Sequence, residues 1–235
     1  MDKTFQRESR RENRRSFLRQ ASIFAIALPA GIYIGCARPA QTQPALASPV
    51  ESGERIGGYC EGCEAIYEGM PAQLNWETRI AATEPGEPLE ASGVIYQPDG
   101  KTPARGVILY AYHTDARGIY PPAPDARGMA RRHGRLRGWI KTNARGEYKF
   151  VTIKPASYPN STIPSHVHLI VKEADKNEYY IDDFEFEDDR FLTQQERARR
   201  RKAGGSGVVS LTKNAGGVWL ARRNITLGLN VQNYR

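Results

Sequence analysis

Residues 165–171 constrain the fold of this chain most, because they place His166 and His168 on either side of one valine at the start of an apolar run. Residues i and i+2 of a β-strand point to the same face, so on a strand the two imidazoles would lie side by side. Imidazole binds zinc, copper, iron and nickel. The pattern therefore predicts either a strand that carries half of a metal site or two unrelated histidines.

Two tyrosines upstream favour the metal site. Tyr158 lies between Pro155 and Pro159, which favour a fixed loop, and Tyr120 is followed by two prolines. A phenol has an ordinary pKa near 10, but a bound hard cation inverts the usual pKa order and ionises its ligand. Two histidines and two tyrosinates would form a non-haem ferric site with room for a further ligand.

These residues lie in segments that resemble the intradiol ring-cleavage dioxygenases, a family that includes catechol and protocatechuate enzymes. The resemblance keeps the order and approximate spacing of the family through about residues 90–172, and four segments carry it: 110–120, 136–150, 152–158 and 164–168. It implies a β-sandwich fold. It also implies that Tyr120, Tyr158, His166 and His168 are the protein ligands of Fe(III).

The resemblance further implies the activity: cleavage, with O2, of the bond between the two hydroxyl-bearing carbons of a catechol or related aromatic diol. Tyr158 would be the catalytic ligand that leaves the iron and accepts a proton when the diol binds. Catalytic members carry an arginine three residues before the first histidine, where this chain has Ile163. Isoleucine donates no hydrogen bond, so Arg137, or an arginine of residues 127–135, is the candidate for that role.

Two functions therefore stay open. The first is a ferric intradiol dioxygenase acting on an aromatic diol with O2, which the complete Tyr-Tyr-His-His set favours. The alternative is a non-catalytic relative that binds iron or a catecholate, which Ile163 favours. Of the other histidines, we expect His113 beside the ligands without binding the metal. We expect His133 in a solvent-exposed loop, or overhanging the site as part of a cationic rim.

The first 47 residues are expected to be an export signal. They hold eight Lys and Arg against three acidic residues, which accounts for +5 of the chain's net charge of +8. The basic character is therefore mostly a targeting property. The charged segment 182–202 has too few interleaved aromatics for a nucleic-acid platform, so the chain is not expected to bind nucleic acid. Arg14 and Arg15 form a twin-arginine pattern. The apolar residues 21–34 that follow are too short to span a membrane; a basic amphipathic helix is the alternative.

The end of the signal is open between two positions. Cys36 follows a partial lipobox in which Tyr33 stands where leucine is usual, and residues 45–47 form a small-x-small cleavage site. We therefore expect an exported protein that is either periplasmic or lipid-anchored through Cys36. Residues 37–55 are expected to form a flexible tether.

Residues 48–88 are expected to be an N-terminal extension that carries Cys60 and Cys63 at C-x-x-C spacing. In an oxidising compartment this pair predicts a small disulfide loop. A redox motif or half of a zinc site are the alternatives, although no second C-x-x-C or nearby histidine supports zinc.

Residues 89–235 predict an all-β domain, a β-sandwich with short helical and loop insertions. Short runs of β-branched and aromatic residues alternate with turn residues, as is typical of sandwiches. The expected strands are 90–96, 106–112, 136–140, 148–153, 166–172, 179–187, 208–211, 217–221 and 224–231. Residues 191–203 predict a helix capped by Thr193, which is either a solvated surface helix or a lid or partner-binding patch.

Overall fold

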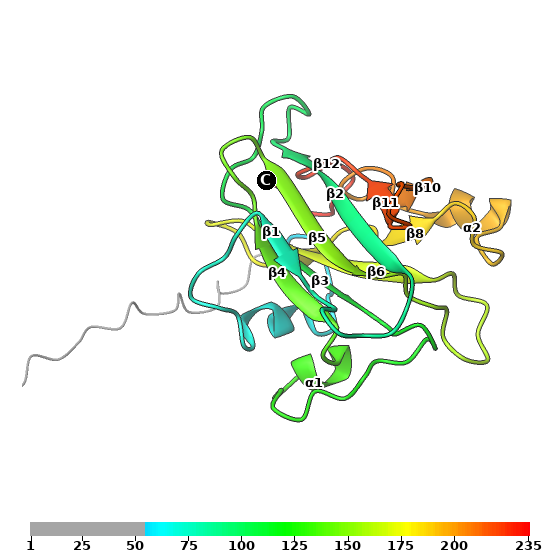
Figure 1. Ribbon diagram of the computed structural model, residues 1–235. Helices are drawn as coiled ribbons and strands as arrows, with labels where there is room; N and C mark the ends of the chain where they lie inside the picture. The colour runs from blue at the N-terminus through cyan, green and yellow to red at the C-terminus, as the bar shows by residue number, and fades with distance from the viewer. Residues whose placement is uncertain (1–54) are drawn as a thin grey trace, which may run out of the picture. The chain divides into compact units, whose positions relative to one another are not determined.

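The strands of this protein form two six-stranded sheets that share one core (Figure 1). The structure is a computed structural model and describes residues 55–235. Arg14, Arg15, Cys36, the signal and most of the tether lie outside the described residues, so the expectations for them stay predictions. No helix within residues 55–235 is long and apolar enough to cross a membrane.

The first sheet has the order β1-β5-β2-β11-β10, and β12 also pairs with β2. Its pairings are mixed: β1 lies parallel to β5, and β2 lies antiparallel to β5 and parallel to β11. One strand, β1, comes from the segment expected to be an extension. The strands are β1 (Glu77–Arg79), β2 (Pro88–Tyr96), β5 (Glu147–Ile153), β10 (Leu211–Lys213), β11 (Trp219–Arg222) and β12 (Ile225–Thr226).

The second sheet has the order β4-β3-β6-β8-β9, and β7 also pairs with β6. Its central strands β3 and β6 are antiparallel and pair over six residues. The strands are β3 (Ile108–His113), β4 (Arg137–Lys141), β6 (His166–Lys172), β7 (Tyr179–Tyr180), β8 (Phe184–Phe186) and β9 (Val208–Val209).

The core between the sheets follows from alternating burial along the strands. In β2 every second residue is buried, including Leu89, Ala91 and Ile95. Leu109 of β3 and Leu169 of β6 face them from the second sheet and belong to the same cluster. Alternation with period two buries one face of each strand. The expectation of an all-β sandwich is confirmed.

The outer face of the second sheet is covered as well, so β3 and β6 are buried on both faces. The cover consists of the short helices η2 (Cys63–Tyr67) and α1 (Ala130–His133). Ile66 and Ala130 pack there against Tyr110 and Ile170 of the sheet. Cys60 and Cys63 are joined by the expected disulfide, which closes the loop leading into η2.

Four elements differ from the expectations. The strand expected over 208–211 is divided between β9 in the second sheet and β10 in the first, and the strand expected over 224–231 is only β12. The single strand expected over 179–187 is two short strands, β7 and β8, separated by residues that do not continue the ladder. The helix expected over 191–203 is only α2 (Gln194–Arg199), whose N-cap Thr193 accepts a hydrogen bond from the Glu196 amide at 3.2 Å, as predicted. It ends early because Arg200 is extended and Lys202 has a left-handed backbone, φ 59°.

Candidate metal centre

The two histidines of β6 lie side by side on the outer face of the second sheet. Val167 and Leu169 alternate with them and belong to the core, so the strand periodicity directs His166 and His168 away from it. Their Nε2 atoms lie 3.0 Å apart. The expected strand with two imidazoles on one face is thus present.

Hydrogen bonds fix the orientation of both rings. Nδ1 of His166 donates to the Pro164 carbonyl at 2.7 Å, and Nδ1 of His168 donates to Oδ1 of Asp183 at 3.2 Å. A carbonyl and a carboxylate only accept hydrogen bonds, so the proton of each neutral ring is on Nδ1. Both Nε2 lone pairs are therefore free to bind a cation, in the arrangement that metal-binding histidines adopt.

Asp183 is a functional residue that sequence reasoning missed. It lies in the break between β7 and β8, and β8 pairs with β6 next to His166. Burial alone would raise the pKa of Asp183, but the adjacent His168, through its charge and its hydrogen bond, holds that pKa below its ordinary value. Asp183 was visible in the sequence only as one member of an acidic run, because its position depends on where the strand breaks.

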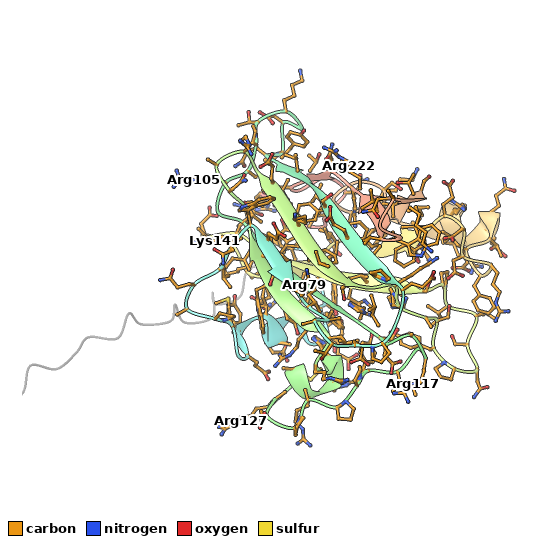
Figure 2. The ribbon with its side chains drawn as sticks, viewed as in Figure 1. Arg79, Arg105, Arg117, Arg127, Lys141 and Arg222 are labelled. Atoms are coloured by element: carbon orange, nitrogen blue, oxygen red, sulfur yellow. A yellow bond between two sulfur atoms is a disulfide. The ribbon has the colours of Figure 1, made fainter. Side chains whose placement is uncertain are left out.

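The two tyrosines enter the site from separate loops that are tied together. In the loop before Tyr120, the buried Asp115 accepts hydrogen bonds from the amides of Arg117 at 2.8 Å and Ile119 at 3.0 Å. The Asp115 carbonyl accepts a further bond from the Ala156 amide of the second loop at 3.1 Å. Figure 2 shows Arg117 on this loop at the edge of the molecule. These bonds set the positions of Tyr120 and Tyr158 relative to each other.

The four side chains bring two oxygens and two nitrogens together. The phenol oxygens of Tyr120 and Tyr158 lie 2.7 Å apart, and Tyr120 Oη lies 3.0 Å from Nε2 of His168. Tyr158 Oη lies 3.3 Å from Nε2 of His166 and 3.4 Å from Nε2 of His168. Separations of this size suit four ligands around one ion.

The chemistry of this donor set fits iron. Burial raises the pKa of both Tyr120 and Tyr158, and the hydrogen bond between the two phenols raises that of Tyr120 further. Ionising both of these half-buried phenols therefore requires a strong positive charge beside them. Imidazole nitrogens are suitable ligands for iron. His166, His168 and Asp183 also lie close enough to form a metal group, but Asp183 faces Nδ1 of His168, opposite the nitrogen that faces the tyrosines.

His133 is buried, so the expectation of an exposed histidine was wrong. It ends α1, its Nδ1 hydrogen-bonds with Tyr110 Oη at 3.1 Å, and its ring stacks on Tyr112 with 3.7 Å between centroids. The other side of Tyr112 stacks on His168 at 4.5 Å. Burial lowers the pKa of His133 to about 3. The sequence did not reveal that His133 is buried, because the ring on which it packs, Tyr112, belongs to a separate element, β3.

His113 lies beside the candidate ligands without bonding to them, as expected, because it pairs with Val167 between the two histidines of β6, whereas Arg137 does not reach the site. His113 is fully buried in contact with Thr114 and Thr152, its Nε2 lying 2.6 Å from the Thr152 hydroxyl, and it bonds to none of the four ligands. Arg137 donates to the Glu68 carbonyl at 3.0 Å and lies over the ring of Trp139. Arg137 is not among the residues that line the cavity of the site.

The four ligands line a cavity of about 880 Å³. One side is formed by the segment around Tyr59 and by His133, and another by Ile163 on the loop before His166. Arg199, Arg200 and Arg201, at the end of α2, complete the lining. Arg200 is held by Glu185 of β8 through two hydrogen bonds, from Nε at 2.7 Å and from Nη2 at 2.5 Å. The candidate metal centre therefore opens into a large cavity whose lining includes charged side chains.

Comparison with known proteins agrees with this architecture. The family model Dioxygenase_C, described as a dioxygenase, matches residues 65–203, which include all four candidate ligands. Catechol 1,2-dioxygenase 1 of Acinetobacter lwoffii is 32% identical in an alignment 108 residues long, with a coverage of 39% of this chain and 34% of that protein. The match therefore spans about a third of that relative's length.

Two solved structures share the fold. One is catechol 1,2-dioxygenase from Acinetobacter sp. ADP1 inhibited by bound mercury, with TM-score 0.50 and 20% identity over 68% of this chain and 58% of that one. The other is 3-chlorocatechol 1,2-dioxygenase from Rhodococcus opacus 1CP, with TM-score 0.50 and 21% identity over 67% and 66% of the two chains. With the family model covering more than half of its length, this chain belongs to the intradiol ring-cleavage dioxygenases.

Proposed function

We propose that this protein is an exported Fe(III) dioxygenase that cleaves a catechol or related aromatic diol with O2. The observation that carries the proposal is the convergence of Tyr120, Tyr158, His166 and His168 with 2.7–3.4 Å between neighbouring ligand atoms. The family uses iron, and ionising the two half-buried phenols calls for a cation of high charge. Iron would supply the redox chemistry that joins O2 to the ring.

The protein residues would bind and orient the diol. The Nδ1 atoms of His166 and His168 are hydrogen-bonded to the Pro164 carbonyl and to Asp183, so both imidazoles would stay in place as ligands. Tyr120 packs against the ring of Tyr112 and makes the shorter contact with His168. Tyr158 makes the longer contacts with the histidines, at 3.3 and 3.4 Å, so it is the more displaceable phenolate. As a phenolate it would accept a proton from an incoming hydroxyl group.

The direct test combines metal analysis with oxygen uptake. Tyrosinate bound to Fe(III) should colour the purified protein red to brown, and the iron-loaded protein should consume O2 when catechols are added. His166→Ala or His168→Ala should remove both the colour and the uptake. Colourless protein with stoichiometric zinc, unchanged in both variants, would contradict the ferric assignment.

Binding without catalysis is the second candidate, and one observation favours it. Ile163 lines the cavity where catalytic relatives are expected to carry an arginine, and Arg137 does not line it. A binding protein would change colour when catechol is added yet consume no O2. An enzyme would do both, so the same assay separates the two candidates.

Export belongs to the proposal as well, and it rests on the sequence of the first 47 residues. Replacing Arg14 and Arg15 together by lysine should leave the protein in the cytoplasm, since the pair is the address that the export machinery reads. Normal export of that double variant would favour a general secretory route. Mass spectrometry of the mature protein would distinguish lipidation at Cys36 from cleavage after Ala47.

A further inference from the structure

The cavity above the candidate metal centre is large for a simple catechol. Its volume of about 880 Å³ lies near the top of the range of roughly 300–1,000 Å³ for pockets that hold drug-sized ligands. Catechol is a single ring, and its two hydroxyl groups would be taken up by the Tyr-His cluster. Most of the cavity would then stay open beyond the ring edge that faces away from the diol.

Two large apolar side chains in this cavity are exposed to solvent. Tyr59 is 89% exposed and Ile163 is 51% exposed, and both line the cavity. Each stands on an anchored segment: Tyr59 directly precedes the disulfide-bonded Cys60, and Ile163 directly precedes Pro164, whose carbonyl accepts the His166 hydrogen bond. Apolar and aromatic side chains that line a cavity favour contact with the apolar part of a ligand.

The acidic side chains and arginines that line this cavity leave no net formal charge. The lining holds as many acidic side chains as arginines, four of each. Arg132 is paired with Glu61, and Arg200 is paired with Glu185. The formal charges therefore cancel, and no net positive charge is left to select a carboxylated or phosphorylated ligand over a neutral one.

From these observations we propose that the substrate is a catechol with an uncharged apolar extension, alkyl or aryl, on the ring edge remote from the diol. The diol binds at the Tyr-His cluster, and the extension packs against Tyr59 and Ile163. The proposal rests on the proposed function for the position of the diol. It makes Ile163 a specificity residue at the place where an arginine is expected in the family.

The test measures affinity in the absence of turnover. Dissociation constants of catechol, 4-butylcatechol and 3,4-dihydroxybenzoate are determined by calorimetry on iron-loaded protein under anaerobic conditions. Burying one CH2 group is worth about a fourfold change in Kd, so 4-butylcatechol should bind at least about tenfold more tightly than catechol. 3,4-Dihydroxybenzoate, which carries a carboxylate in place of the alkyl chain, should bind no more tightly than catechol. Equal affinities for catechol and 4-butylcatechol, or no binding of either, would overturn the proposal.

Variants locate the contact. Ile163→Ala and Tyr59→Ala should each remove severalfold of the preference for 4-butylcatechol and leave the Kd of catechol unchanged. Leu229→Ala is the matched control, because Leu229 is 44% exposed and does not line the cavity. A preference that survives both cavity variants would contradict the assignment. Oxygen uptake with catechol alone reports on the proposed function separately, so failure of one idea is distinguishable from failure of the other.

Discussion

Gly118 lies directly against the carbonyl of Ser157, so closely that a Cβ atom on Gly118 would be 1.9 Å from that oxygen. The contact joins the two loops that carry Tyr120 and Tyr158. Gly118 also has φ +79°, a left-handed conformation that glycine adopts without strain. The separation of the two phenols thus depends on the absence of a side chain at residue 118.

Gly118→Ala should therefore both destabilise the protein and weaken metal binding. A left-handed alanine costs about 1–2 kcal/mol, and pushing the Ser157 loop away adds about 1–3 kcal/mol. Gly217→Ala is the control, since Gly217 also has φ +79° but has open space around its Cβ position. Urea unfolding and iron content should show a larger loss for Gly118→Ala. Equal losses in the two variants would mean that the contact with Ser157 is unimportant.

Asp183→Asn should lower iron affinity about 10- to 100-fold, as is usual when the hydrogen-bond partner of a metal-bound histidine is changed. The amide oxygen of asparagine would still accept a hydrogen bond from Nδ1 of His168. It carries no negative charge, however, so it would not strengthen Nε2 of His168 as a metal ligand. Competition with a chelator, followed by the colour of the protein, measures the effect. Asp175→Asn, at an exposed pair with Lys176, is the control and should change nothing. An unaltered affinity in Asp183→Asn would remove Asp183 from the metal centre.

Arg223→Met should lower the free energy of unfolding by at least about 2 kcal/mol, because buried carbonyls would lose their donors. Arg223 is 3% exposed and donates to the carbonyls of Asp182, Ala203 and Gly205. Arg223 therefore fixes the backbone near residues 199–201, the three consecutive arginines that line the cavity. Its neighbour Arg222 is exposed and labelled in Figure 2, so Arg222→Met should change stability by no more than about 0.5 kcal/mol. Similar urea midpoints for the two variants would refute this role.

Acid should destabilise the protein between pH 6.5 and 4, partly through His113. Burial lowers the pKa of His113 from 6.5 to about 4. In this window the unfolded chain binds a proton that the folded chain does not, so stability is complete above pH 6.5 and falls as the pH falls. The loss amounts to about 3 kcal/mol at 1.36 kcal/mol per pKa unit.

Urea unfolding of His113→Gln across this window checks the assignment. The variant should show a shallower dependence on pH than the unmodified protein, although buried His133, whose pKa is about 3, leaves part of the slope in place. An identical slope in the two proteins would show that His113 contributes no proton linkage.

Local sequence patterns predicted most of the strands and the pair of histidines, and the family resemblance added Tyr120 and Tyr158 to the candidate ligands. Short runs of β-branched, aromatic and apolar residues predicted β2, β5 and β6. The H-x-H pattern set both imidazoles on one face because strand periodicity is a local property. The C-x-x-C spacing predicted the Cys60–Cys63 disulfide for a similar reason, since two half-cystines three residues apart close their loop without help from the rest of the chain.

The tertiary structure decided how residues distant in the chain meet. The stacking of His133 on Tyr112, the bond from His168 to Asp183 and the contact of Gly118 with Ser157 each join separate elements. The break between β7 and β8 likewise depends on pairing with β6 rather than on the propensity of residues 179–187. Sequence alone determined which side chains are available as ligands. Packing of loops on the outer face of a sheet determined which groups support them and how large the cavity is, because these contacts exist only once the sheets have formed.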